Sequence, residues 1–434
     1  MIWRLFALFA LIALPLRAEI AIQEVTSPGG IKAWLVEEHG IPFTALEIRF
    51  QGGTATDAPG KRGAVNLMTA LIEEGAAEMS AQKFAESRDA LAAEFKFSAS
   101  TDAISVSARM LTENRAKAAE LLRLALTHPR FDADAVERVR GQVLSNIRAN
   151  LKDPGTIAGD AFARLAFGDH PYGSSGDGTV DSVTALTRDD ILAAHQGTLA
   201  RDRIYVSAVG DITAEELGAL LDHLLGGLPA TGAPLPGPAP VALSGGVTVQ
   251  DFPTPQAVLM FGHEGIPRDD PDYFAAFILN EVLGGGRFSS RLMTELREKR
   301  GLTYGVGTYL ADYDQADLMM GQFATDNRTA AEAITILRAE WAKAAEGITA
   351  DELAAAKTYL TGAYPLRFDG NGTIANILVG MQMQGLGTDY PATRNARIEA
   401  VTLADVARVA KRLVRPDGLR IVVVGQPDGV VTGP

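Results

Sequence analysis

The sequence contains no cysteine, and only 6 of its 434 residues are histidine. Without thiols, the chain cannot form disulfides, cysteine nucleophiles, thiolate zinc sites or cysteine-ligated iron–sulfur clusters. Basic residues are also in deficit, with 40 Lys and Arg against 53 Asp and Glu, so the net charge is −13. This acidic balance disfavours binding to nucleic acid and to anionic membranes. Metal or acid–base chemistry would therefore depend on the few histidines and on carboxylates.

Long apolar runs are likewise scarce, and the one that matters lies at the N-terminus. A short start that includes Arg4 precedes the apolar run Leu5–Leu16, and the small residue Ala18 follows it. This order is typical of a signal peptide, and the run is shorter than the roughly 20 residues of a membrane-spanning helix. We expect residues 1–18 to be removed and the mature protein to be periplasmic or otherwise exported, with no membrane attachment. Because Arg17 beside the cut is unusual, a retained anchor is the alternative.

Two stretches of the sequence, residues 186–212 and 401–427, resemble each other. Matching residues are 402 − 187 = 215 positions apart: Thr187 with Thr402, Asp190 with Asp405, and Gly210 with Gly425. In each copy, Thr followed three residues later by Asp is typical of a helix start, and a β-branched strand ends on Gly. A period of this length is too long for a solenoid and predicts a duplicated domain.

A Pro/Gly-rich stretch without periodicity separates the two copies. Such a composition is typical of a semi-rigid linker. We therefore predict an N-terminal domain over residues 19–228, a linker over 229–244, and a C-terminal domain over 245–434. Hydrophobic residues make up 47% of the chain, which is enough to form a core in each domain.

Within the domains, segments with strand periodicity alternate with amphipathic helical segments. The patterns predict strands at Ile31–Glu37 and Thr44–Gln51 and helices at Ala81–Phe95 and Thr112–Leu126. Both domains are therefore predicted to be α+β, each a β-sheet covered by helices.

Two further segments carry polar residues of interest. Residues 60–75 have the apolar spacing of a core helix. In residues 283–301, the three glycines 284–286 are followed by a predicted helix. Its predicted buried face consists of Phe288, Leu292, Met293 and Leu296. Leu302, Tyr304 and Val306 then alternate as in a strand. Taken singly, Arg297 fits a solvated cation near a helix C-terminus, and Tyr304 fits a packed strand residue.

Together these segments resemble the pitrilysin/insulinase family of zinc metallopeptidases, in its bacterial two-domain form related to mitochondrial processing peptidase. The landmarks occur in the family's order over nearly the whole mature chain: Gly52-Gly53, the helix after Gly60-Lys-x-Gly63, the turn His170-Pro-Tyr-Gly173, the repeated strands, and Arg297-Glu-Lys-Arg-Gly-Leu-x-Tyr304. The resemblance implies two homologous α+β domains that form one half of a clam-shaped peptidase.

The family's zinc site is the inverted motif H-x-x-E-H on the first helix, with a further glutamate downstream. In this sequence the two histidine positions are Asn66 and Ala70, the glutamate position is Thr69, and the downstream position falls at Asn146. These residues cannot replace two imidazoles and two carboxylates, and no His-x-x-x-His pair occurs anywhere in the chain. We therefore expect no zinc in this chain and no peptidase activity from it alone.

By contrast, the substrate pair of the family's second domain is present. The resemblance implies that Arg297 and Tyr304, seven residues apart (304 − 297 = 7), reach a peptide held at a partner's zinc. A guanidinium and a phenol suit a peptide carbonyl, a carboxylate or a developing oxyanion. The predicted function is that of a non-catalytic subunit that binds peptide or unfolded protein substrate beside a zinc-bearing homologous subunit.

Two alternatives remain open at this point. The chain could be a structural or peptide-binding homologue with no role in hydrolysis, like the peptidase-derived core subunits of a respiratory complex. It could also be an autonomous peptidase with an unrecognised site, which we rank last. A neighbouring gene for an exported homologue with an intact H-x-x-E-H would favour the heterodimer.

Overall fold

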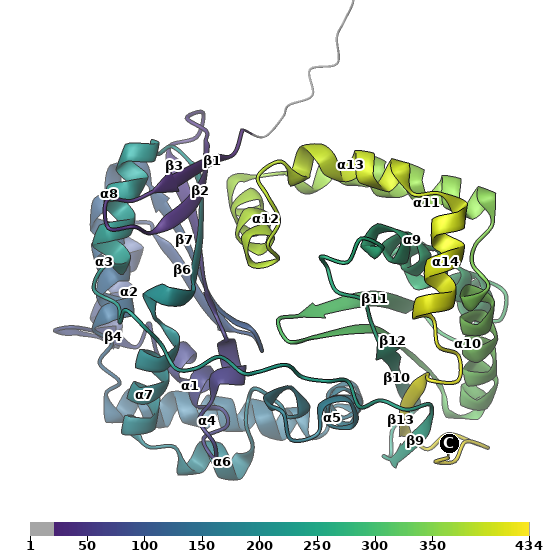
Figure 1. Ribbon diagram of the computed structural model, residues 1–434. Coiled ribbons are helices and arrows are strands. Elements are labelled where there is room, and N and C mark those ends of the chain that lie inside the picture. Colours follow the sequence, from purple (N-terminus) through teal and green to yellow (C-terminus); the bar gives the residue numbers. More distant parts are fainter. Residues whose placement is uncertain (1–20, 434) are drawn as a thin grey trace, which may run out of the picture.

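The computed structural model describes residues 21–433. The expected signal peptide, residues 1–18, lies outside the described residues. Two halves, each built on one mixed β-sheet with helices on its outer side, face each other across the molecule (Figure 1). The predicted α+β class is confirmed. Within residues 21–433, no helix is both long and apolar enough to cross a membrane.

The N-terminal half contains a six-stranded sheet. Its strands lie in the order β1 (Gln23–Thr26), β2 (Lys32–Glu37), β8 (Ile204–Gly210), β3 (Phe43–Gln51), β7 (Ala103–Leu111) and β6 (Glu94–Ala99). Only β2 and β8 pair in parallel. The helices of this half are α1 (Ala64–Ala70), α2 (Ala81–Ala90), α3 (Arg115–Thr127), α4 (Ala133–Asn150), α6 (Val180–Ala185), α7 (Arg188–Thr198) and α8 (Ala214–Leu225). A short hairpin, β4 (Gly75–Ala76) and β5 (Met79–Ser80), lies before α2.

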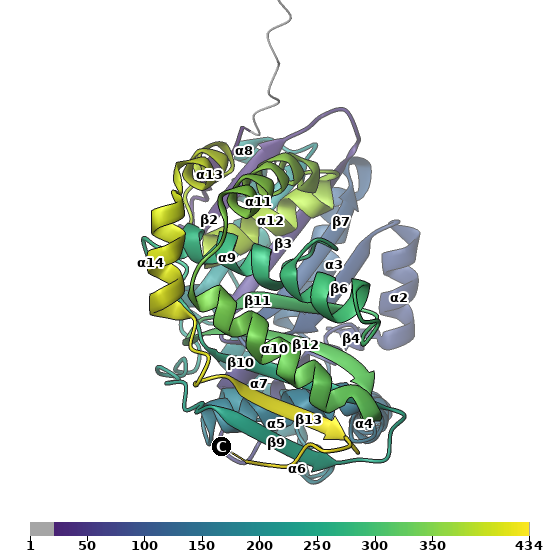
Figure 2. The same cartoon turned by 90° about the vertical axis from the view of Figure 1, so that its right-hand side faces the viewer.

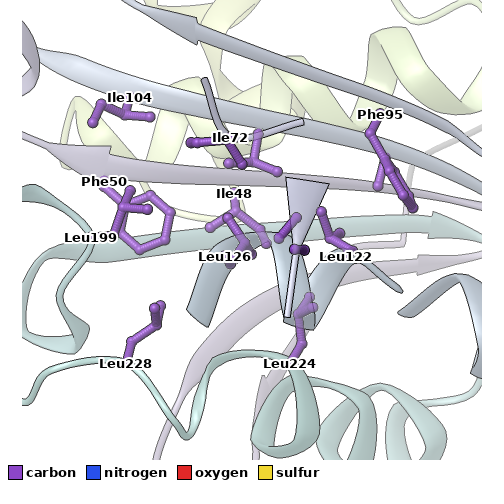
Figure 3. Close-up of a cluster of buried hydrophobic side chains, with 14 of the residues drawn as sticks. Ile48, Phe50, Ile72, Phe95, Ile104, Leu122, Leu126, Leu199, Leu224 and Leu228 are labelled. Atoms are coloured by element: carbon purple, nitrogen blue, oxygen red, sulfur yellow. The ribbon is translucent and has the colours of Figure 1, made fainter. Parts of the chain in front are cut away.

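The core of this half lies between the sheet and its outer helices (Figure 3). Alternate residues of β3, among them Ile48 and Phe50, are fully buried. They belong to the same cluster as Leu122 of α3 and Leu224 of α8. Because strand side chains alternate between faces, the intervening residues of β3 point to the opposite, inner side of the sheet.

The C-terminal half contains a five-stranded sheet with the same topology. Its strands lie in the order β9 (Gly246–Asp251), β13 (Arg420–Gly425), β10 (Gln256–Glu264), β12 (Ala316–Asp326) and β11 (Val306–Tyr313). Only β9 and β13 pair in parallel, as β2 and β8 do in the first sheet. The helices are α9 (Tyr273–Gly284), a π-helical turn (Met293–Glu298), α10 (Ala330–Ala345), α11 (Ala350–Ala363), α13 (Tyr390–Ala400) and α14 (Leu403–Leu413). Figure 2 shows α10 in front of this sheet, on its outer side.

The sequence repeat is a structural repeat. Thr187 and Asp190 form a reciprocal capping box at the start of α7, and Thr402 and Asp405 form the same box at the start of α14. Helix α7 leads into β8, which pairs in parallel with β2, and α14 leads into β13, which pairs in parallel with β9. The duplicated domain predicted from these residues is therefore confirmed by matching caps and matching strand order.

Each sheet is covered on its inner face by a helix from the other half. Helix α5 (Pro154–Phe167) packs on β10 and β13, and α12 (Asn371–Met383) packs on β3 and β8 (Figure 1). Phe162 of α5, only 2% exposed, joins Val422 and Val424 of β13 in one cluster. Strand β13 reads as a continuous apolar run over Ile421–Val424 because both of its faces are buried.

The segment between the halves, residues 229–244, has no helix or strand and lies against both of them. In the N-terminal half, the Arg201 amide donates to the carbonyl of Pro229 at 2.9 Å. Further along, Ala239 bonds to the β11–β12 turn and Ala242 to the end of α5, at 3.0 and 2.8 Å. These backbone bonds fix its course along the molecule.

One predicted helix is wrong in its extent. The sequence pattern predicted a helix over Ala81–Phe95, whereas α2 ends at Ala90 and Phe95 lies in β6. Ala92 adopts a left-handed conformation with φ of 47°, which a helix cannot continue through. The helix predicted over Thr112–Leu126 is present as α3, preceded by a 3₁₀ turn.

The hairpin of β11 and β12 places Asp312 directly opposite Asp317. Burial, and then the charge of Asp312, raises the pKa of Asp317 from 3.8 to about 6. The folded state therefore holds this proton more tightly than the unfolded chain does. The resulting cost in stability is fully present above about pH 6 and disappears as the pH falls toward about 4.

We expect Asp317→Asn to raise the free energy of unfolding near neutral pH by roughly 0.2–1 kcal/mol, because like charges at facing cross-strand positions are destabilising by about this amount. The gain should shrink at about pH 5, where the wild-type carboxyl is largely protonated. Urea unfolding at the two pH values measures it, with Asp369→Asn, an exposed carboxylate, as the control. An equal gain at both pH values would contradict the assignment.

Candidate functional site

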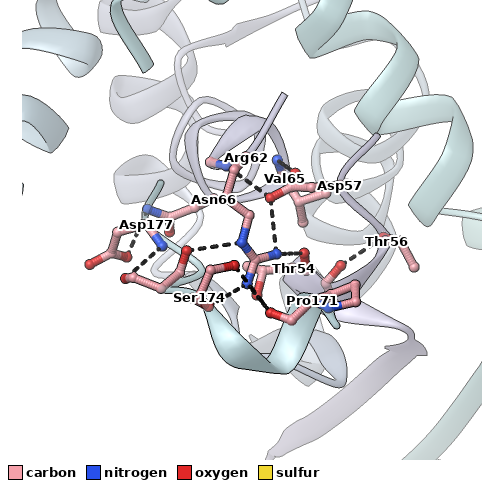
Figure 4. Close-up of polar contacts among 12 residues, drawn as sticks. Thr54, Thr56, Asp57, Arg62, Val65, Asn66, Pro171, Ser174 and Asp177 are labelled. Atoms are coloured by element: carbon pink, nitrogen blue, oxygen red, sulfur yellow. Dashed lines mark hydrogen bonds and ion pairs between the residues drawn. The ribbon is translucent and has the colours of Figure 1, made fainter. Parts of the chain in front are cut away.

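The first element of the site is the short helix α1, whose N-terminus is held by a buried carboxylate. Asp57 accepts hydrogen bonds from the backbone amides of Gly63 and Val65, both at 2.8 Å (Figure 4). A carboxylate there is favoured by the helix dipole. Burial raises the pKa of Asp57, while these two amides and Arg62 oppose the shift.

Arg62, just before the helix, ties it to the turn that follows His170. Its guanidinium donates to the carbonyls of Pro171 and Ser174 at 2.9 and 2.8 Å, and also to that of Thr54 (Figure 4). It also forms an ion pair with Asp57 at 3.4 Å. The helix that carries the zinc motif elsewhere in the family is thus fixed by a charged network, independently of any metal.

The residues at the former ligand positions are engaged in other contacts or lack polar atoms. The Asn66 amide donates to Asp177 Oδ1 at 3.1 Å, and the buried Thr69 hydroxyl donates to the Val65 carbonyl at 2.8 Å. Ala70 presents only a methyl group and is exposed. An amide, a back-bonded hydroxyl and a methyl group do not form a zinc ligand set.

The fourth position, Asn146, does not meet the other three. It is exposed on α4, and within residues 21–433 its side chain makes no hydrogen bond to α1. One turn later, Asn150 donates to Asp177 Oδ2 at 3.2 Å. The structure therefore brings Asn66 together with Asn150 and Asp177, two residues that the sequence motif did not identify.

No other site in the described part of the chain fits a metal. Over residues 21–433, no three His, Asp or Glu side chains lie close enough together to hold one. The two buried histidines have other partners: His195 contacts the Leu126 carbonyl at 2.8 Å, and His263 is held by the Trp341 indole and the Glu264 carbonyl. The zinc of the peptidase family therefore does not fit this chain.

The second element of the site is a cavity of about 740 Å³ in the C-terminal half. Arg297, on the π-helical turn, and Tyr304, just before β11, both line it. The glycine-rich loop 284–286 forms part of the wall, and Gly155 of α5 contributes from the N-terminal half. The two residues predicted to contact substrate are thus brought to one cavity.

The chain around Tyr304 is rigidly anchored although Tyr304 itself is not. The amide of Gly301, with φ of 64°, and the amide of Leu302 bond back to the carbonyls of Arg297 and Leu296, a glycine-dependent helix end. Thr303 is buried and bonds to both backbone groups of Gly305. Between these anchors the Tyr304 side chain points outward and is 88% exposed.

Two local predictions in this region are wrong. Phe288 was expected on the buried face of the helix, but it is 60% exposed, and its ring lies 4.5 Å from the Arg297 guanidinium. The other three residues of the predicted face, Leu292, Met293 and Leu296, are buried in the core as expected. The strand expected from Leu302 begins only at Val306, because the Thr303 turn intervenes.

Asp177 could not be found from the sequence, since 111 residues separate it from Asn66. Its local signal is weak: it stands between two glycines shortly after the His170 turn. Gly155 carries no sequence signal for a role in a cavity of the other half.

We expect the purified protein to contain no stoichiometric zinc and to cleave no peptide alone, because Asn66, Thr69 and Ala70 provide no ligand set. The variant with Asn66→His, Thr69→Glu, Ala70→His and Asn146→Glu should also lack tight zinc. Position 146 is exposed and, within residues 21–433, makes no hydrogen bond to α1, and the polar surroundings of position 66 are arranged for the Asn66 amide and Asp177. Elemental analysis after dialysis measures both. About one zinc per wild-type chain, lost together with peptidase activity on chelation, would contradict this interpretation.

Comparison with known proteins gives matches to both halves. Residues 33–179 match the family described as Insulinase (Peptidase family M16), and residues 185–360 match the family described as Peptidase M16 inactive domain. An uncharacterized zinc protease of Streptomyces coelicolor is 29% identical over 405 residues, which cover 90% of this chain and 86% of that protein. The non-peptidase homolog YmxG of Helicobacter pylori is 24% identical, covering 89% of this chain and 90% of that protein.

A solved structure supports the same relationship. The crystal structure of a peptidase M16 inactive domain from Pseudomonas fluorescens matches with a TM-score of 0.87 at 28% sequence identity, covering 95% of this chain and 100% of that one. The similar proteins thus include zinc proteases, a non-peptidase homologue and an inactive domain.

Proposed function

Because the chain belongs to the insulinase family of peptidases, peptidase family M16, and has no zinc ligands on its first helix, we propose that it is the non-catalytic subunit of an exported heterodimeric zinc metallopeptidase. In this proposal a homologous partner carries the zinc. The present chain binds the peptide or unfolded protein substrate and supplies Arg297 and Tyr304 to the partner's active site.

The observation that carries the proposal is the state of these two side chains. Within residues 21–433, neither the Tyr304 hydroxyl nor the Arg297 guanidinium has a hydrogen-bond or ion-pair partner, and both line the same cavity. An aromatic residue that is 88% exposed contributes little to stability. Free donors on a rigidly anchored loop are what recognition of a ligand carbonyl or oxyanion requires.

The wall of the cavity also suits an extended peptide. Strand β11 is the edge strand of its sheet, so one side of its backbone is unpaired. An extended segment can add to such an edge through main-chain hydrogen bonds. Gly286 in the wall leaves room for close approach of a second backbone, since no atom of the described residues other than its chain neighbours lies within 4 Å of the position that a Cβ would take.

We expect Tyr304→Phe and Arg297→Ala to leave assembly with the zinc-bearing partner intact and to lower peptide turnover. Loss of one donor to a developing oxyanion typically costs on the order of 10²–10³ in rate. The measurement is hydrolysis of an unfolded peptide by the co-purified pair of subunits. Tyr359→Phe and Arg338→Ala make the same chemical changes at exposed positions on α11 and α10, and serve as matched controls.

If all four variants hydrolyse peptide at the wild-type rate while the complex still forms, the chain is a structural or peptide-binding homologue without a role in hydrolysis. If no homologue with an intact H-x-x-E-H co-purifies with the chain, the heterodimer itself is contradicted.

Export is the other part of the proposal, and it rests on the order of basic, apolar and small residues in 1–18. We expect mass spectrometry of the protein from its native host to find a mature N-terminus near Glu19, in the exported fraction. An intact N-terminus in the cytoplasm would contradict export, whereas an intact N-terminus in the membrane fraction would identify a retained anchor.

A further inference from the structure

A second cavity, of about 340 Å³, lies between helices α9, α12 and α13 and the turn that follows α11. It shares no lining residue with the cavity of Arg297 and Tyr304. Its wall consists mainly of arginine and aromatic side chains, among them Arg268, Tyr273, Tyr364, Arg367, Tyr390 and Arg394. No aspartate or glutamate lines it.

The three arginines of this cavity have no carboxylate partner. Over the described residues 21–433, neither Arg268, Arg367 nor Arg394 forms an ion pair. The charge of Arg268 acts to lower the pKa of Asp312, but the two residues, both within 21–433, form no ion pair. In a chain with a net charge of −13, acidic side chains are in excess, yet none neutralises these guanidiniums.

Aromatic rings and neutral oxygens hold the guanidiniums in place instead. Arg268 lies 4.1 Å from the ring centre of Tyr273 and donates to the Tyr390 hydroxyl. Arg394 lies 4.1 Å from the ring centre of Tyr364 and donates to a backbone carbonyl at 3.0 Å. Contacts of this kind orient a guanidinium without neutralising its charge.

The arrangement is costly when the cavity is empty. Arg394 is only 6% exposed, and burial lowers its pKa, with the nearby charge of Arg367 acting in the same direction. The Nε atom of Arg268 is buried and has no hydrogen-bond partner within the described residues. Buried charges are normally paired, because an unpaired one loses its hydration without compensation.

We propose that this cavity binds a carboxylate that carries an aromatic or apolar group, with Arg268, Arg367 and Arg394 around the carboxylate. Guanidiniums match the planar, two-oxygen geometry of a carboxylate, and the tyrosine rings provide apolar surface for the rest of the ligand. The volume is near the lower end of small-molecule sites, so the ligand is small. Either a free aromatic acid or the C-terminal residue of a peptide has this chemistry. The site does not depend on the proposed partner subunit.

The test is isothermal titration calorimetry on the mature chain alone. N-acetyl-L-phenylalanine has the carboxylate and the ring, and its primary amide keeps the ring and the shape but replaces one charged oxygen by a neutral NH₂ group. We expect the acid to bind saturably and the amide to bind at least about tenfold more weakly, since hydrogen bonds to a charged group are the stronger ones. A peptide ending in phenylalanine, with a free or an amidated C-terminus, distinguishes a peptide source from a free acid.

Variants place the binding at this cavity. Arg367→Gln changes an exposed residue that the fold should tolerate, and Arg268→Gln removes a guanidinium from the wall. Each should weaken binding of the acid about tenfold or more. Arg338→Gln, the same change at an exposed position on α10, should have no effect. Thermal unfolding of each variant confirms that it is folded.

Equal affinity for the acid and the amide would overturn the proposal. So would acid binding that neither folded arginine variant weakens, or the absence of saturable binding to the wild-type chain. Binding of the free-carboxylate peptide but not of its amide supports the proposal and identifies a peptide C-terminus as the source.

Discussion

The exchange of one helix between the two halves is the constraint on which the rest of the structure depends. Strands β8 and β13 are buried on both faces over most of their length, so each is covered on its inner side as well as its outer side. That cover comes from α12 for the first sheet and from α5 for the second. A fully buried large apolar side chain such as Phe162 contributes about 1.5–3 kcal/mol relative to an exposed one. Neither half can bury its own sheet alone, so the two halves are held in a fixed relation.

Both candidate binding cavities follow from this exchange. The cavity of Arg297 and Tyr304 includes Gly155, which reaches the C-terminal half only because α5 crosses to it. The arginine cavity includes Asn376 of α12, which accepts a hydrogen bond at 2.5 Å from Arg49 of the first sheet. A change in the packing of α5 or α12 would therefore alter the shape of a binding cavity as well as the stability of the fold.

The sequence predicted what depends on local chemistry and missed what depends on distance along the chain. The capping boxes at Thr187 and Thr402 and the strand over Thr44–Gln51 follow from neighbouring residues, and the structure contains all three. The helix exchange joins segments far apart in the chain, such as Ser207 with Ala375 at 168 positions and Arg49 with Asn376 at 327, and no local pattern encodes it. Arg268 and Arg394 meet across 394 − 268 = 126 positions, which composition alone cannot show.

The positions of the zinc motif show the same limit of sequence analysis, which cannot identify contacts between residues far apart in the chain. The motif position of Asn66 could be read from the sequence, but its partner Asp177 could not. Through Asp177 the structure joins the amides of Asn66 and Asn150, so the former metal position is a satisfied polar network and not a vacancy. Removing one member of such a network lowers the stability of the fold, because a buried polar group that loses its hydrogen-bond partner is costly. Histidines placed on α1 would therefore lie among side chains that are arranged to hydrogen-bond to amides and not to orient zinc ligands.

Carboxylates at the junction of the two halves repel each other, so the exchanged helices α5 and α12 must hold the halves together. Where the β11–β12 turn meets the first half, Asp102 accepts hydrogen bonds from the Tyr172 hydroxyl and from the Asp314 amide. Burial raises the pKa of Asp102 to about 6, with the charge of Asp314 acting in the same direction, so this contact is under repulsion at neutral pH. Facing like charges cost up to about 1 kcal/mol, whereas each large side chain buried by α5 or α12 contributes more than that. Apolar packing thus holds together a junction that its own carboxylates oppose.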